Sequence, residues 1–220
     1  MKITYDEIKK NETINTYIRQ ADENLKSLGF TEHSFAHVVK VAEAAGIILT
    51  ELGYDERIIE LAKIAGYMHD IGNVINRIDH AQSGAVMSFR ILDKMGVDAE
   101  DIATIVAAIG NHDESTAFPV NPVAAALIIA DKSDVRESRV RATADIKTDI
   151  HDRVNYAVKK QKLSIDGTKK FITLSLMIDT EICHVMEYFE IFIGRMSLCK
   201  KAADKLGLQF KLIINEQEMM

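Results

Sequence analysis

Residues 58–72 read IIELAKIAGYMHDIG, an apolar run that ends in the polar pair His69-Asp70. The run is typical of a buried helix, and the Ile71-Gly72 that follows indicates a turn. The stretch therefore predicts a helical core in which an imidazole and a carboxylate lie where one helix ends. Either residue alone is more often a solvated cap than a functional group, so a chemical role requires partners elsewhere in the chain.

The composition is that of a globular protein with a sizeable core. Of the 220 residues, 47% are apolar and 27% are charged. The net charge of −6 argues against broad binding of nucleic acid or anionic membrane, but it permits a local basic pocket for one phosphate. No apolar run reaches the ~18 residues of a membrane span. The N-terminal residues, MKITYDEIKKNETINTYIRQ, are not typical of a signal peptide.

Apolar residues recur every three or four positions through the first part of the chain, which predicts a series of helices. The expected helices cover residues 5–28, 34–52, 56–68, 80–95, 99–110 and 123–132, with loops at 72–79 and 111–120. Asp55, Asp98 and Asn121 are the expected caps of three of them. The last helix begins VAAALIIA and is apolar on all sides, so we expect it at the centre of the core.

The pattern changes after about residue 155. Two strand-like runs, 161–165 and 170–178, flank Asp166-Gly167, which is a signal for a type I′ hairpin. Asp179-Thr180 is the expected cap of a long amphipathic helix over residues 181–206, and alternation over 208–214 predicts a last strand.

The expected fold class is therefore mainly α. It consists of a helical bundle at residues 1–155, followed by a small ββαβ α+β extension at 156–220 that packs on the bundle or extends it. The open edges of a three-stranded sheet are where we expect contact if the protein forms a homodimer.

The sulfur-containing residues indicate no cofactor. Cys183 and Cys199 both fall on the expected helix 181–206, where ~1.5 Å per residue would separate them by about 24 Å. They cannot then form a disulfide, and reduced thiols favour a cytoplasmic protein. Met177, Met186 and Met196 are expected to fill the core.

Histidines and acidic residues recur near the ends of successive expected helices. The candidate set is His37, His69, Asp70, His80, His112 and Asp131. Asp131 follows AALIIA and is the strongest signal for a buried charge, which requires a cation or a metal beside it. Imidazole and carboxylate together suit Zn, Fe, Mn or Ni better than Ca. The set therefore predicts a metal site in a helical bundle.

The local sequences around these residues make the set specific. They are HVVKVAEAAG from His37, HDIG from His69, HAQSGA from His80, NHDE around His112 and ADKSD around Asp131. Over residues 30–142 they resemble the HD-domain superfamily of metal-dependent phosphohydrolases. The resemblance implies an all-helical domain.

The same resemblance implies a ligand set. The minimal metal site of the superfamily corresponds here to His37, His69, Asp70 and Asp131. Members that also carry two intermediate histidines resemble dinuclear sites in which the aspartate of the HD pair bridges, and His80 and His112 stand at those positions. The implied cofactor is a divalent transition metal, two ions of Fe, Mn, Zn or Ni.

Some features depart from the superfamily's patterns. Many dinuclear relatives carry two histidines where this chain has Asn111-His112, which leaves open which loop residue binds and whether Asp113 contributes. The GYP motif of the cyclic dinucleotide phosphodiesterase branch is absent. A second HD dipeptide, His151-Asp152, lacks the surrounding pattern and is expected on a solvated helix face.

The resemblance implies a hydrolase in which metal-activated water attacks the phosphoryl group of a small phosphorylated molecule or nucleotide. We expect Asp70, Lys132 and Asp134 to be catalytic, with Lys132 as a donor to developing charge and Asp134 as a general acid or as the group that orients Lys132. Arg77, Arg136 and Arg139 are candidate substrate-binding residues. For each arginine, an ordinary surface charge is an equally good interpretation.

Two other functions stay open. The four histidines and two aspartates also resemble the mixed-valence di-iron oxygenases of the superfamily. Alternatively, the chain is a ligand-sensing or assembly module that binds metal without turnover. His33 is either a pocket residue or an ordinary polar residue, and His184 is expected to be structural. Neither a nucleic acid nor a membrane is an expected partner.

Overall fold

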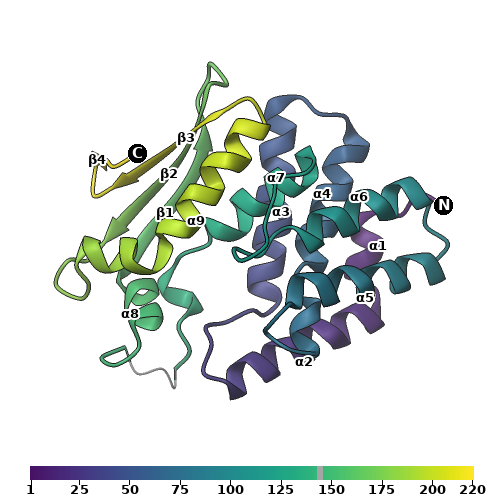
Figure 1. Ribbon diagram of the computed structural model, residues 1–220, viewed down its shortest axis with the longest axis horizontal. Coiled ribbons are helices and arrows are strands. Elements are labelled where there is room, and N and C mark those ends of the chain that lie inside the picture. Colours follow the sequence, from purple (N-terminus) through teal and green to yellow (C-terminus); the bar gives the residue numbers. More distant parts are fainter. Residues whose placement is uncertain (143–145) are drawn as a thin grey trace.

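The computed structural model describes residues 1–142 and 146–220, and its helices form a bundle with a small sheet at one side (Figure 1). The helices are α1 (Tyr5–Lys9), α2 (Glu12–Ser27), α3 (Phe35–Leu52), α4 (Glu56–Met68), α5 (His80–Lys94), α6 (Ala99–Gly110), α7 (Pro122–Lys132), α8 (Ile150–Ala157) and α9 (Val185–Lys205), with 3₁₀ turns η1 (Ile71–Val74) and η2 (Glu137–Arg139). The strands are β1 (Val158–Ile165), β2 (Phe171–Ile178), β3 (Gln209–Ile214) and β4 (Gln217–Glu218). The expected class, mainly α with a small α+β extension, is confirmed.

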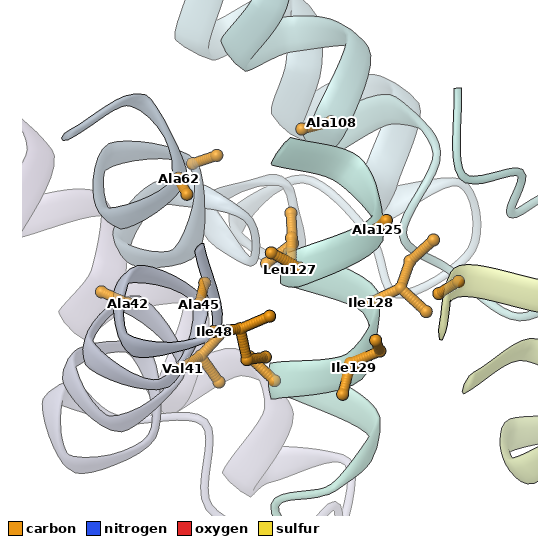
Figure 2. Close-up of a cluster of buried hydrophobic side chains, with 14 of the residues drawn as sticks. Val41, Ala42, Ala45, Ile48, Ala62, Ala108, Ala125, Leu127, Ile128 and Ile129 are labelled. Atoms are coloured by element: carbon orange, nitrogen blue, oxygen red, sulfur yellow. The ribbon is translucent and has the colours of Figure 1, made fainter. Parts of the chain in front are cut away.

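Helix α7 lies at the centre of the bundle, as its sequence predicts. Asn121 caps it by accepting a hydrogen bond from the Ala124 N–H at 2.8 Å, and Pro122 occupies the first position. The helix contacts α3, α4, α6 and α9. Figure 2 shows Ile48 of α3 and Leu127 of α7 among the buried side chains of this region. Four helices therefore surround α7, and its last turn carries Asp131.

Two glycines allow the close approach that brings the site helices together. A Cβ atom on Gly66 would lie 2.7 Å from the Ala42 Cα, so only glycine lets α4 pack this tightly on α3. A Cβ atom on Gly72 would overlap the carbonyl oxygen of His80 and lie 2.5 Å from the Gly84 nitrogen. The glycine of HDIG therefore lets the first turn of α5 pack directly on η1.

The sheet has the order β1-β2-β3-β4. Strands β1 and β2 form an antiparallel hairpin, whereas β2 and β3 are parallel and are joined through α9. The alternation over β2 buries Ile172, Leu174, Leu176 and Ile178, as predicted. Helix α9 contacts both β3 and α7, so it lies between the sheet and the bundle (Figure 1).

The bundle and the extension share one hydrophobic core, which includes residues from Ile3 to Ile214. The expected division at residues 155 and 156 falls inside α8, and α8 continues directly into β1. No described helix has the length and apolar character needed to cross a bilayer.

The single helix expected over residues 5–28 is wrong. The structure ends α1 at Lys9 and starts α2 at Glu12. Asn11 causes the break, because its side chain accepts hydrogen bonds from the N–H groups of Thr13 at 3.0 Å and Ile14 at 3.2 Å and so begins a new helix. The expected loop at 72–79 likewise contains most of η1.

The type I′ turn at Asp166-Gly167 is also wrong. The loop covers residues 166–170, and the positive φ is at Lys169 (54°) rather than at Gly167. The Asp166 carboxylate stabilises this longer loop by accepting from the N–H groups of Lys170 at 2.8 Å and Phe171 at 2.7 Å. The sheet also has a fourth strand, β4, where three strands were expected.

Helix α9 begins at Val185 instead of residue 181. Asp179 accepts from the Glu181 N–H at 3.1 Å in a separate turn, and the His184 N–H donates to the Glu187 carboxylate at 3.0 Å where the helix begins. His184 is therefore an exposed N-cap residue instead of a structural core histidine. Cys183 precedes the helix, so the separation argued from a shared helix does not apply.

Both cysteines are nevertheless buried and free. The three methionines differ in environment. Met196 is buried as expected, but Met177 is 44% exposed and Met186 is 73% exposed. The expectation of core filling is therefore wrong for Met177 and Met186.

Candidate metal centre

The structure brings all six candidate metal ligands together. His37 lies in the first turn of α3, His69 and Asp70 join α4 to η1, His80 begins α5, His112 follows α6, and Asp131 lies in the last turn of α7. The four histidines and Asp70 are buried, and the Asp131 side chain is 11% exposed. The helix ends therefore converge on one polar cluster inside an apolar bundle.

Asp70 lies between two groups of ligands and turns one carboxylate oxygen toward each. Its Oδ2 is 3.2 Å from His69 Nε2 and 3.6 Å from His37 Nε2. Its Oδ1 is 3.6 Å from His80 Nε2 and 4.0 Å from His112 Nε2. Asp131 joins the first group, because its Oδ1 is 3.3 Å from His37 Nε2. Asp70 is thus placed as a bridge between two lobes of the cluster. The first lobe holds His37, His69 and Asp131, and the second lobe holds His80 and His112.

The spacing of the ligand atoms fits a metal ion. Metal–ligand bonds of about 2.1 Å separate neighbouring ligands by roughly 3.0–3.4 Å in octahedral or tetrahedral geometry. Within the second lobe, His80 Nε2 and His112 Nε2 are 3.2 Å apart. Three overlapping groups of three ligands each have their atoms within 4.8 Å of one another. The donor set could therefore hold a divalent metal.

The backbone and one carboxylate orient the imidazoles. The Nδ1 atoms of His69, His80 and His112 lie 2.8, 3.0 and 2.6 Å from the carbonyl oxygens of residues 66, 77 and 109. Since a carbonyl only accepts, each Nδ1 carries the proton and each Nε2 presents a lone pair to the centre. The Nδ1 of His37 has a carboxylate partner instead, Asp134 Oδ2 at 2.8 Å. This arrangement is the usual one for histidine ligands of metals.

Several atoms at the centre lack protein partners. Among the described residues, His37 Nε2, His69 Nε2 and Asp70 Oδ2 are buried and make no hydrogen bond. Such groups cost free energy unless something satisfies them. All three are ligand atoms of the same lobe, so the residues present fit a bound cation.

Charge at the centre favours ionised carboxylates and neutral His80 and His112, whereas the Asp70 carboxylate outweighs burial and raises the pKa of His69. Burial alone would raise the pKa of Asp70, but the neighbouring His69 imidazole holds it well below its ordinary value. Burial alone would also raise the pKa of Asp131, but the Lys132 ammonium keeps this pKa well below its ordinary value. Burial lowers the pKa of His80 and lowers that of His112 to about 3. Both carboxylates are therefore ionised and both histidines neutral near pH 7.

Lys132 and Asp134 occupy different places. The buried Lys132 Nζ lies 2.7 Å from Asp131 Oδ2 and lines the cavity. Asp134 contacts His37, Lys40 and Arg136 rather than Lys132. The hydrogen bond with His37 leads the interactions that outweigh burial and hold the pKa of Asp134 well below its ordinary value, so Asp134 has no proton to donate near neutrality. It is placed to position His37.

The three arginines separate into two groups. Arg77 and Arg139 line the cavity beside the cluster. The Arg77 guanidinium lies over the Phe30 ring at 5.6 Å. Arg136 does not line this cavity: it binds Asp134 at 2.9 Å and borders a separate hollow with Lys159. The structure therefore does not bring Arg136 to the candidate centre.

The sequence leaves open which residue of the loop after α6 faces the cluster and whether Asp113 contributes. The Asn111 amide donates to the Ala107 carbonyl at 2.9 Å and is directed back along its helix. His112 is the residue that faces the cluster. Asp113 Oδ1 lies 3.9 Å from His80 Nε2 and is partly exposed, so it borders the second lobe.

A cavity of about 460 Å³ adjoins the cluster, which itself contributes Asp70, His80, His112 and Asp131 to the lining. His33 lines it too, with its ring centroid 5.5 Å from that of His37, so its pocket interpretation agrees with the structure. Asp152 of the second HD dipeptide is buried and lines the cavity, whereas a solvated face was expected.

Sequence reasoning missed other residues. Asn73 donates to Asp70 Oδ1 at 2.9 Å, and only its place three residues after the HD pair could have indicated this. Glu114 lies 3.5 Å from Lys132 and 2.5 Å from Arg195 of α9. No local motif marks Arg195, because the contact depends on how α9 packs on the bundle.

Comparison with known proteins agrees with this geometry. Residues 34–142 match the HD domain family. The chain therefore belongs to the HD-domain superfamily.

Particular relatives share parts of the chain. It is 24% identical over 203 residues to an uncharacterized protein of Methanocaldococcus jannaschii, across 82% of this chain and 78% of that one. It is 36% identical over 76 residues to ribonuclease Y of Latilactobacillus sakei, across 34% of this chain and 13% of that enzyme. With ribonuclease Y of Fervidobacterium nodosum it shares 32% over 105 residues, across 46% and 18% of the two chains. The match thus spans less than a fifth of either ribonuclease.

A solved structure also shows similarity. It is the crystal structure of a predicted HD superfamily hydrolase from an uncultured Thermotogales bacterium, with a TM-score of 0.45 and 27% identity over 56% of this chain and 67% of that one.

Proposed function

We propose that this protein is a metal-dependent phosphohydrolase that acts on a small phosphorylated molecule or nucleotide, with two divalent ions bridged by Asp70. The observation that carries the proposal is the placement of the two Asp70 oxygens, one toward the lobe of His37, His69 and Asp131 and one toward His80 and His112. A bound divalent ion supplies Lewis-acid chemistry, because it lowers the pKa of water toward neutrality and polarises a phosphoryl oxygen.

The residues around the cavity have defined roles in this proposal. Lys132 and Arg77 line the cavity and supply positive charge for a phosphoryl group. Glu114, 3.5 Å from Lys132, holds the lysine ammonium at the wall. Asn73 holds Asp70 through its amide, and Asp134 holds His37 through its carboxylate. These side chains orient the ligands and the substrate.

Two alternatives keep specific support. The similarity to ribonuclease Y supports cleavage of an RNA phosphodiester, although the net charge of −6 argues against broad electrostatic binding of RNA. The donor set of four histidines and two aspartates also fits di-iron redox chemistry. Metal content and substrate tests separate all three.

The test is hydrolysis by purified protein supplied separately with Mn²⁺, Ni²⁺, Zn²⁺ or Fe²⁺. We expect at least one metal to support anaerobic release of phosphate from small phosphate esters or nucleotides, with His69→Ala inactive. His184→Ala is the matched control, because His184 is exposed at the start of α9 and should leave the rate unchanged. Cleavage restricted to an RNA oligonucleotide would contradict the proposal, as would an iron-dependent reaction that requires oxygen.

A further inference from the structure

One wall of the cavity comes from the C-terminal part of the chain rather than from the metal ligands. Asp149, Asp152 and Asn155 come from the start and the face of α8, and Phe192 and Arg195 come from α9. All five lie outside the matched HD domain, residues 34–142. They have no place among the candidate metal ligands, so this wall is available to recognise the part of a substrate that is not phosphate.

Asp152 and Asn155 are the buried polar side chains of this wall, each only 5% exposed. Three residues apart on α8, they lie on one face of the helix. The Asp152 backbone N–H donates to Asp149 at 3.1 Å. Its carboxylate, however, has neither a hydrogen bond nor an ion pair with any of residues 1–142 and 146–220. The side chain lines the cavity, so this carboxylate is an acceptor that a bound ligand could reach.

Asn155 offers the same chemistry. Its Nδ2 donates to the His151 carbonyl at 2.9 Å, which fixes the orientation of the amide because a carbonyl only accepts. The Asn155 Oδ1 receives no hydrogen bond from a described residue. The two side chains therefore present acceptor atoms to which no described protein group donates. Burial, with Asp149 close by, also raises the pKa of Asp152, as expected for a carboxylate that no donor stabilises.

We propose that Asp152 and Asn155 form a subsite that binds the hydroxyl groups of the substrate's organic part, so that the preferred substrate is a small phosphate ester of a sugar or another polyol. This inference rests on the proposed function, which places the phosphoryl group at the metal ligands. The volume of about 460 Å³ lies within the range of roughly 300–1,000 Å³ typical of sites for one small molecule. Hydroxyl groups of a substrate could donate hydrogen bonds to these two acceptors.

Calorimetry with stable analogues tests the subsite without turnover. The probes are two phosphonates, in which CH₂ replaces the ester oxygen, made from ribose 5-phosphate and from phenyl phosphate. The phenyl compound has no hydroxyl donor on its organic part. We expect wild-type protein loaded with Mn²⁺ to bind the ribose compound more tightly. Asp152→Asn should weaken that binding about tenfold and leave the phenyl compound unaffected, since it removes a charged acceptor at nearly constant volume.

Two further variants complete the test. Asn155→Ala should weaken the ribose compound selectively, and circular dichroism establishes that each variant is folded. Asp204→Asn, at an exposed position of α9, is the matched control and should change neither affinity. Equal losses for both probes, or no loss, would overturn the subsite. Tighter binding of 2-aminoethylphosphonate would overturn the hydroxyl assignment in favour of an ammonium group.

The result is independent of the proposed reaction. If wild-type protein hydrolyses no phosphate ester with any metal, the proposed function fails, whereas the selectivity between the two phosphonates still decides the subsite.

Discussion

Asp134 connects the candidate metal centre to the surface of the protein. Its Oδ2 receives His37 Nδ1 at 2.8 Å, and its Oδ1 receives Lys40 Nζ at 2.8 Å and Arg136 Nε at 2.9 Å. A carboxylate in this position fixes the tautomer of a histidine ligand and increases its basicity. The side chain would thereby influence a bound metal without contacting it.

Asp134→Asn should lower metal affinity by about 10–100-fold, the usual cost of removing such a partner of a ligand. Competition with a chromophoric chelator measures the change. Arg136→Gln removes a contact on the outer side of the same carboxylate and should change affinity far less. Unchanged affinity in Asp134→Asn would show that His37 does not depend on this contact.

The two thiols should be unreactive in the folded protein. Burial, aided by Glu187, raises the pKa of Cys183 to about 11, and burial raises that of Cys199 to about 12. A raised thiol pKa leaves less thiolate, so at pH 8 roughly a thousandth or less of each is reactive. We expect Ellman's reagent to label both only after unfolding, with a native rate that rises about tenfold per pH unit below pH 11. Rapid native labelling at pH 8 would contradict this.

The candidate ligands can be found from the sequence because each has a distinctive local sequence. Arg195 and Asn155 cannot be found in this way, because their roles depend on contacts between segments far apart in the chain. The short spacing between Lys132 and Asp134 suggests a shared catalytic role. The hydrogen bond to His37, 97 positions earlier, cannot be read from that spacing.

At the scale of elements, the packing of η1 on α5 holds His80 beside Asp70. Gly72→Ala should destabilise the protein by about 1–3 kcal/mol, because the new methyl group would overlap the His80 carbonyl. Chemical denaturation measures this loss, and metal analysis should show weaker binding in the second lobe.

Gly194→Ala is the control for this change. A Cβ at Gly194 would meet no atom within 4 Å, and alanine is the better residue inside a helix. This variant should therefore match or exceed wild-type stability. If Gly72→Ala were equally stable, the close contact between η1 and α5 would not be required.

Elements that contain a long, regular pattern of apolar residues could be predicted from the sequence. The positions where those elements begin and end were harder to predict. Helix α7 is apolar nearly throughout, and its cap and proline mark its start, so its position follows from the sequence. The starts of α2 and α9 depend instead on the hydrogen bonds of the Asn11 side chain and of the His184 N–H, which compete with longer helical patterns. The loop after β1 depends on the Asp166 carboxylate, which the dipeptide signal does not include.

At the scale of the whole molecule, the C-terminal extension completes the cavity of the HD domain. Its helix α9 packs on α7 and carries Arg195 to Glu114, beside Lys132. The sequence predicted the extension as a separate range, but the shared core and the shared cavity make it one wall of the candidate site. That relation could not be predicted, because it depends on how two distant segments pack.

Metal stoichiometry tests the central claim, a two-metal centre bridged by Asp70, most directly. Plasma mass spectrometry on protein equilibrated with metal should find two ions per chain in the wild type. The double variant His80→Ala/His112→Ala should retain one ion, and Asp70→Ala should retain none. One ion in the wild type, unchanged in the double variant, would contradict the account.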